Sequence, residues 1–233
     1  MVQVTAHRGL SHDFPENTLL AFQKAVELGV DVIELDVRLS GDKKIIVSHD
    51  SDLIRCARKP GNTSELDYDT IKSYNLGMGQ HVPILEDVLD LVKDKNVVLN
   101  IEIKEYELEQ QLVSMIKRTN TGKKVMFSSF LHPVLMEIRD LLPEAFICSI
   151  FGSLEPLTIN DLINQVKSID AKYINLNHTK ISPDIVEKVH NTGLGLTAWT
   201  IDSVVEMQYF IDIGVDNICT NEAERLMRLL GRV

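Results

Sequence analysis

Short apolar runs that are typical of buried strands alternate with segments of helical periodicity along almost the whole chain. A strand-like run at 2–6 precedes a helical pattern at 17–28, and a second run at 32–37 turns into a third at 44–48. The alternation becomes regular after residue 80. The helices predicted there are 85–93, 108–119, 133–142, 159–168, 183–191, 204–213 and 222–230, and the strands are 97–104, 124–130, 145–151, 173–177, 194–200 and 216–220.

Apart from the short run at 44–48, the chain has eight predicted strands with helices between them, and this number favours one architecture. Strands joined by helical crossovers run parallel, and eight such units in 233 residues are typical of a TIM (β/α)8 barrel. We therefore predict an α/β fold in which residues 1–233 form a single TIM-barrel domain, with a small insertion after the second strand at about 50–80. A doubly wound open sheet is the alternative, but no glycine-rich nucleotide loop follows the first strand.

The composition narrows the class of partner. The net charge of −10 argues against a nucleic-acid or anionic membrane partner, because both require basic patches. No apolar run approaches about 18 residues, so no membrane insertion is expected. The three cysteines form neither a zinc spacing nor a disulfide framework, and no signal peptide is evident. We expect a cytoplasmic protein that acts on a small molecule, and its oligomeric state stays open.

Three carboxylates lie inside apolar strand sequences. Glu34 and Asp36 are two residues apart and therefore share one face of their strand, and Glu102 lies in the next strand of the predicted barrel. Buried carboxylates cost several kcal/mol if they are left unpaired, so a cation or a buried network must compensate them. Because oxygen ligands suit hard ions, the three residues predict a site for one divalent cation, Mg²⁺ or Ca²⁺.

Two histidines flank this carboxylate cluster at the ends of predicted strands. His7 ends the first strand, and His49 ends the run at 44–48. Active sites of TIM barrels gather at the carboxyl ends of the strands. Histidine can act as a base or as an acid near neutral pH, so the pair predicts general acid–base catalysis.

Two cations and one aromatic residue complete the candidate site. Arg8 follows His7, and Lys104 shares a strand face with Glu102, so both are predicted to bind a phosphate group. Trp199, the only tryptophan, lies near the end of the seventh barrel strand and is predicted to form a wall of the substrate site.

The same residues belong to an ordered series of short motifs. In chain order these are His7-Arg8-Gly9, Pro15-Glu16-Asn17-Thr18, Glu34-Leu35-Asp36-Val37, Ser48-His49-Asp50, Pro83-Ile84-Leu85-Glu86, Ile101-Glu102-Ile103-Lys104, Ser128-Ser129-Phe130, Trp199-Thr200-Ile201-Asp202 and Gly214-Val215-Asp216-Asn217-Ile218-Cys219-Thr220. In this order, and over nearly the entire chain, they resemble the glycerophosphodiester phosphodiesterase family.

The resemblance implies a divalent cation held by Glu34, Asp36 and Glu102, and catalytic histidines at His7 and His49. The implied activity is hydrolysis of a glycerophosphodiester, such as glycerophosphocholine or glycerophosphoethanolamine, to sn-glycerol 3-phosphate and an alcohol. Without an evident signal peptide, the chain is similar to the cytoplasmic members of the family.

The chain departs from the family pattern at a few positions. Asn221 stands where an aspartate is common, and Cys56-Ala57 stands where a threonine often follows the arginine. The turn Leu39-Ser40-Gly41-Asp42-Lys43 differs from the usual one. None of these positions belongs to the predicted metal and histidine set.

Three alternative functions are considered for the same site. A non-catalytic barrel that binds phosphodiesters is the first, since fold alone does not determine function. The second is another phosphodiesterase activity, such as a cyclising reaction of the phospholipase D-like kind. The third is a sugar-phosphate aldolase with Lys104 as Schiff-base lysine, which leaves the carboxylates and histidines unexplained. The nucleophile, which is water or a neighbouring glycerol hydroxyl, and the assignment of base and acid also stay open.

Overall fold

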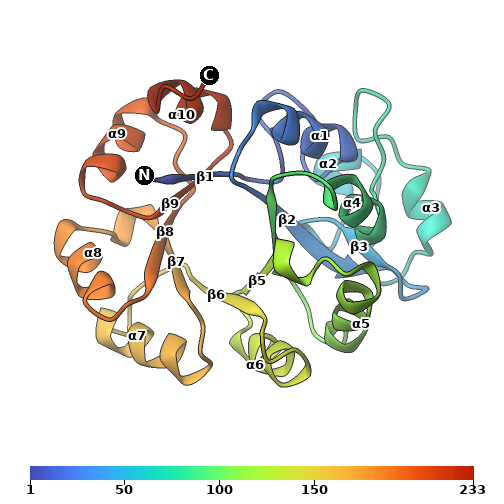
Figure 1. The fold of residues 1–233 in the computed structure, drawn as a ribbon. Helices are drawn as coiled ribbons and strands as arrows, with labels where there is room; N and C mark the ends of the chain where they lie inside the picture. Colours follow the sequence, from blue (N-terminus) through green and yellow to red (C-terminus); the bar gives the residue numbers. More distant parts are fainter.

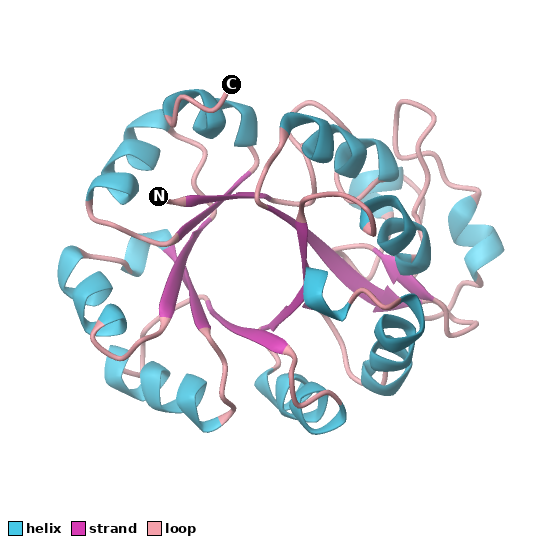
Figure 2. Ribbon diagram, in the orientation of Figure 1, coloured by secondary structure: helices cyan, strands magenta, loops and turns pink.

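The computed structural model describes residues 1–233 and shows a closed barrel of eight parallel strands surrounded by helices (Figures 1 and 2). Strand β1 pairs with both β9 and β2, which closes the barrel. This confirms the predicted TIM barrel. Its strands, in chain order, are β1 (Gln3–Ala6), β2 (Val32–Leu39), β4 (Val98–Ile103), β5 (Val125–Ser129), β6 (Phe146–Phe151), β7 (Tyr173–Asn177), β8 (Gly195–Trp199) and β9 (Asn217–Thr220).

Helices cover the outside of the barrel, as Figure 1 shows. The first begins after Thr18, whose hydroxyl accepts a hydrogen bond from the Ala21 N–H, and ends at Gly29, whose φ of 79° is readily adopted only by glycine. The helices are α1 (Leu19–Leu28), α4 (Leu85–Val92), α5 (Glu109–Thr119), α6 (His132–Leu141), α7 (Ile159–Ser168), α8 (Pro183–His190), α9 (Val204–Asp212) and α10 (Ala223–Leu229), with short 3₁₀ turns η1 (Gly122–Lys124) and η2 (His178–Lys180).

The predicted insertion after the second strand is present and lies beside the barrel (Figure 1). It starts with β3 (Ile45–Val47), which runs antiparallel to the outer end of β2, and continues through α2 (Ile54–Ala57) and α3 (Tyr68–Lys72). Its own small apolar cluster consists of Ile46, Leu53, Ala57, Tyr68, Ile71 and Val82. The insertion therefore packs as a compact unit beside the carboxyl end of β2, beyond the part of β2 that pairs with β1.

The two faces of the barrel strands differ in polarity. In β2, Ile33, Leu35 and Val37 are buried in the main core, whereas Glu34 and Asp36 alternate with them and face the other way. The buried polar residues Thr5, Asn100, Asn175, Thr197 and Asn217 line the cavity inside the barrel. The hydrophobic core thus lies between strands and helices, and the barrel interior is unusually polar for this fold.

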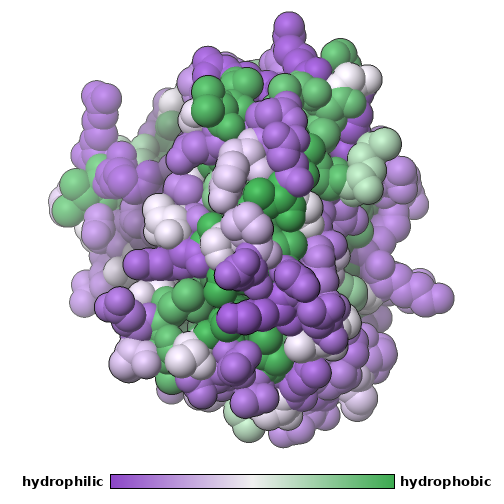
Figure 3. All heavy atoms as spheres, turned by 90° about the vertical axis from the view of Figure 1, so that its left-hand side faces the viewer, coloured by the Kyte–Doolittle hydropathy of each residue, from purple (hydrophilic) through white to green (hydrophobic).

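The face of the molecule shown in Figure 3 is mainly hydrophilic. Figure 3 views the side that lies to the left in Figure 1, where α7, α8 and α9 cover the barrel, and its hydrophobic residues lie in small groups between polar ones. None of the helices has the length and apolar character needed to span a membrane.

Candidate active site

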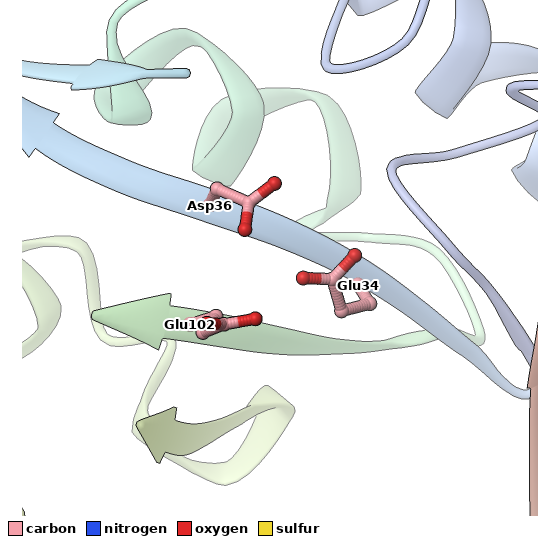
Figure 4. Close-up of side chains that lie close together, drawn as sticks. All are labelled: Glu34, Asp36 and Glu102. Atoms are coloured by element: carbon pink, nitrogen blue, oxygen red, sulfur yellow. The ribbon is translucent and has the colours of Figure 1, made fainter. Parts of the chain in front are cut away.

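The three predicted metal-binding carboxylates converge inside the barrel mouth. In the parallel pairing of β2 with β4, Asp36 lies directly opposite Glu102, and Glu34 lies one side-chain repeat earlier on β2. One oxygen from each of the three carboxylates can be chosen so that all lie within 4.8 Å of one another. Figure 4 shows the three side chains around one shared space. The structure therefore brings together the residues that the strand pattern singled out.

Burial and mutual repulsion disfavour negative charge at two of these carboxylates. Burial, together with the charges of the neighbouring carboxylates, raises the pKa of Glu34 well above its usual value and that of Glu102 to about 7. Burial also opposes ionisation of Asp36, but Lys104 and Arg8 outweigh this effect and lower its pKa. Glu34 Oε1 is buried without a hydrogen-bond partner. This donor set, rich in oxygen and short of positive charge, fits a hard divalent cation.

The raised pKa of Glu102 predicts that its charge destabilises the metal-free protein. The neutral form is preferred in the folded state, so the cost is absent below the unfolded pKa of about 4.5. It grows between this pH and the folded pKa of about 7, and it is fully present above that pH. Glu102→Gln, which mimics the neutral form, is expected to raise the free energy of unfolding at pH 7.5 by about 1–3 kcal/mol. Thermal or urea unfolding of the EDTA-treated protein measures this gain.

Glu86→Gln is the matched control, because this carboxylate is partly exposed on α4 and pairs with Arg118 on the surface. It is expected to change the stability by less than about 0.5 kcal/mol. A destabilised Glu102→Gln protein under the same conditions would contradict the assigned cost.

His7 ends β1 with one ring nitrogen held and the other directed at the carboxylates. Its Nδ1 lies 2.8 Å from Asn221 Oδ1, and the Asn221 amide nitrogen donates to Asp202 at 2.7 Å. Because the amide nitrogen of Asn221 is held by Asp202, its amide oxygen faces the imidazole. Nδ1 of His7 therefore carries the proton. Nε2 then has a lone pair toward the site, 4.0 Å from Glu34.

His49 follows β3 and is held in a similar way by a carboxylate. Its Nδ1 lies 2.7 Å from Asp50 Oδ1, and because an ionised carboxylate only accepts hydrogen bonds, Nδ1 is the donor. Burial lowers the pKa of His49 and of His7, and the Arg8 charge lowers that of His7 further. Both rings are therefore mainly uncharged at neutral pH, with Nε2 available as a proton acceptor.

The two predicted phosphate-binding cations lie against the carboxylates. The backbone N–H of Arg8 donates to Glu34 at 2.9 Å, and its guanidinium donates to Glu16 at 2.8 Å and approaches Asp36 at 3.4 Å. Lys104 Nζ lies 3.0 Å from Asp36 and donates to Glu102. Both cations, Arg8 and Lys104, therefore lie at the barrel mouth in contact with carboxylates, where an anionic group could also reach them.

The turn after β1 explains why a glycine follows Arg8. Gly9 has a φ of +80°, and a Cβ at this position would lie 2.8 Å from Ala21 at the start of α1. The glycine therefore allows the chain to pass close to α1 while the preceding residues remain at the barrel mouth.

Trp199 lies at the end of β8 and lines the same cavity, whose volume is about 490 Å³, as do the two histidines. Its ring meets Phe130 edge to face with the centroids 5.6 Å apart, and the Phe130 ring lies 6.0 Å from Lys104 Nζ. The two aromatic rings thus form an apolar wall beside the charged group, in the position predicted for Trp199.

Sequence reasoning missed the residues that hold the predicted ones in place. Asn17 donates to Asp36 at 2.8 Å, although the sequence pattern places it only at the start of a helical segment. Asn221 and Asp202 orient His7, and Arg55, in the insertion, contacts Glu16 and Asp50. The motifs containing Asn17 and Asp202 were the only available signal, and nothing in the sequence connects Arg55 to the site.

Comparisons with known proteins find relatives over nearly the whole chain. A model of the Glycerophosphoryl diester phosphodiesterase family matches residues 7–225. A glycerophosphodiester phosphodiesterase of Caldanaerobacter subterraneus subsp. tengcongensis is 35% identical over 241 residues, which cover 97% of each chain. The crystal structure of a glycerophosphodiester phosphodiesterase from Thermotoga maritima is 27% identical, with a TM-score of 0.85 over 98% of each chain.

The fold is shared more widely. An Oleispira antarctica phosphodiesterase, solved in complex with the product sn-glycerol-3-phosphate, is 21% identical and has a TM-score of 0.89, with 98% of this chain and 96% of that chain covered. The matched region from residue 7 to residue 225 contains every site residue described above.

Proposed function

The chain belongs to the glycerophosphoryl diester phosphodiesterase family and is an enzyme of that class, and we propose that it hydrolyses glycerophosphodiesters in a metal-dependent reaction with two catalytic histidines. The proposed substrates are small diesters such as glycerophosphocholine and glycerophosphoethanolamine, and the products are sn-glycerol 3-phosphate and the alcohol. That the Oleispira antarctica phosphodiesterase binds this product supports the choice. We also propose that residues 1–233 act as a single domain in the cytoplasm.

The observation that carries the proposal is the position of the two imidazoles. His7 and His49 line one cavity together with Glu34 and Glu102, and each is held through Nδ1, which leaves Nε2 for proton transfer. A binding protein needs cations for a phosphodiester but has no need of two oriented, uncharged histidines. This arrangement therefore favours catalysis over binding alone.

Glu34, Asp36 and Glu102 are the proposed ligands of one divalent cation, Mg²⁺ or Ca²⁺. When bound, the ion supplies positive charge that stabilises the charge developing on the phosphoryl oxygens. Arg8 and Lys104 lie at the same carboxylates and are proposed to bind the phosphodiester oxygens. Trp199 and Phe130 exclude water along one wall and contact the apolar part of the substrate.

In the proposed reaction one histidine accepts the proton of the nucleophile at Nε2. The other first takes up a proton from solvent at Nε2 and, as an imidazolium, gives it to the oxygen of the departing alcohol. The P–O bond to the alcohol breaks as the new P–O bond forms. The nucleophile is water or the neighbouring glycerol hydroxyl, and in the second case water then opens a cyclic phosphate.

The proposal is tested with EDTA-treated enzyme and the two named diesters, with and without added Mg²⁺ or Ca²⁺. Glycerol 3-phosphate is followed with a coupled dehydrogenase, and ³¹P NMR detects a cyclic phosphate in the same samples. Release of glycerol 3-phosphate only after metal is restored is the expected result. Added glycerol 3-phosphate controls for effects of metal or EDTA on the coupling enzyme.

Other outcomes point to the alternatives. A cyclic phosphate as the final product would replace hydrolysis by a cyclising reaction. Tight binding of the diesters without turnover under either metal would favour a non-catalytic barrel, and full activity in EDTA would remove the metal from the proposal.

A further inference from the structure

Arg55 connects two side chains that each hold a proposed active-site residue. Its Nη1 and Nη2 each lie 2.7 Å from one oxygen of Glu16, and its Nε donates to Asp50 Oδ2. Glu16 also accepts from Arg8, and the other oxygen of Asp50 accepts from His49. One guanidinium thus joins Arg8 and His49, which lie on separate elements, through two carboxylates.

The insertion holds Arg55 in this place. Arg55 lies on α2, whose neighbouring residues Leu53 and Ala57 are buried in the apolar cluster of the insertion. The Asp52 side chain accepts from the backbone N–H of Ile54, and the Leu53 N–H donates to the Gly61 carbonyl. The backbone on both sides of Arg55 is therefore anchored, and its guanidinium is presented to the barrel mouth rather than left mobile.

The network differs from an ordinary surface ion pair. The Arg55 side chain is 49% exposed, and for such a residue a single pair contributes little to stability. Here the contact with Glu16 is bidentate, and all three nitrogens of the guanidinium are used. Both carboxylates also contact a proposed active-site residue, so the geometry serves orientation more than stability.

We propose that Arg55 is a positioning residue that orients His49 through Asp50 and Arg8 through Glu16. The inference rests on the proposed functions of those two active-site residues. It makes the insertion part of the catalytic apparatus, because the residue that orients one histidine and one phosphate-binding cation comes from α2 and not from a barrel strand. The two branches have different consequences: the Asp50 branch affects proton transfer, and the Glu16 branch affects substrate binding.

Steady-state kinetics of single variants separates the two branches. Arg55→Met is expected to lower kcat and raise KM, each by about 10-fold, which is typical of lost orientation of a reacting group. Asp50→Asn is expected to lower mainly kcat, and Glu16→Gln to raise mainly KM. Arg55→Lys keeps the charge but lacks the planar guanidinium that binds Glu16 through two nitrogens. It is therefore expected to recover only part of the lost kcat and KM. The double variant Arg55→Met with Asp50→Asn is expected to have the kcat of the poorer single variant.

The pH profile gives a second readout that a merely structural residue would not change. Besides Asp50, the charges that shift the pKa of His49 are Asp36, which raises it, and Lys104 and Arg8, which lower it. The Arg38 guanidinium donates to the backbone carbonyl of His49 and to the side chain of Glu105. Without Arg55 the full charge of Asp50 acts on His49 and raises its pKa. The part of the pH profile of kcat/KM that follows the titration of His49 therefore moves to higher pH in Arg55→Met. It moves to lower pH in Asp50→Asn.

Controls distinguish failure of this inference from failure of the proposed function. Arg118→Met removes another arginine–glutamate surface pair, with Glu86, and is expected to keep kcat and KM within twofold of the parent enzyme. If His49→Ala is inactive but Arg55→Met has unchanged kcat, KM and pH profile, Arg55 has no positioning role. If His49→Ala itself retains activity, the proposed catalytic pair is wrong. Should Arg55→Met unfold, Arg55→Lys and Asp50→Asn still decide the question.

Discussion

Alanine in place of His7 or His49 is expected to lower kcat by about 10³-fold without loss of the fold. Each ring is held through Nδ1 and directs Nε2 into the cavity, and neither contributes to the apolar core between strands and helices. Its removal therefore takes away a proton-transfer group but little packing. Single-turnover assays with glycerophosphocholine, together with circular dichroism and thermal unfolding, measure both effects.

His81→Ala is the matched control for the histidine variants. This histidine lies in the insertion, and its ring contacts only the Tyr74 carbonyl in an exposed position. Its loss is expected to leave kcat unchanged within twofold. A rate near that of the parent enzyme for His7→Ala or His49→Ala would remove that histidine from the proposed pair.

Asp36→Asn is expected to reduce activity by at least about 10²-fold and to weaken divalent-metal binding by about 10–100-fold. Asp36 is fully buried and lies opposite Glu102. Its side chain contacts Asn17, Arg8 and Lys104, so the loss of its charge removes the central member of the three carboxylates. Calorimetric titration with Mg²⁺ or Ca²⁺ measures the affinity, and excess metal is expected to restore part of the activity.

The exposed carboxylate of Asp170 supplies the control for this substitution. Asp170 pairs with Lys172 at the surface, and Asp170→Asn is expected to change neither metal affinity nor rate. Metal binding by Asp36→Asn that equals that of the parent enzyme would place the cation elsewhere.

Two of the three proposed metal ligands, Glu34 and Glu102, oppose the stability of the metal-free protein. Burial raises the pKa of Glu34 and Glu102, and the two nearest cations do not balance three carboxylates. Amides at these two positions would make the metal-free protein more stable. For this reason Glu102→Gln is expected to raise its free energy of unfolding. In the proposed function, binding of the cation to the folded site compensates for the burial of these carboxylates.

The pattern along the chain was sufficient to predict the architecture and to choose the candidate site residues. Alternation of apolar strands with helical segments is a local property, and helical crossovers require parallel pairing. The number of such units and the missing glycine-rich nucleotide loop then favoured a barrel over a doubly wound open sheet. Placing Glu34 and Asp36 on one face needed only the two-residue repeat of a strand. The family resemblance rested on the same short motifs, and the match over residues 7–225 confirms it.

Only the tertiary structure decided how these groups are oriented. The pairing of Asp36 with Glu102 depends on the register between two strands separated by the whole insertion, and the sequence contains no measure of that register. The links from Asn221 to His7 and from Arg55 to Asp50 and Glu16 join residues on segments that are far apart in the sequence. Backbone periodicity predicts the face of a strand, but the contacts of loop side chains arise when the barrel closes and the insertion packs beside it.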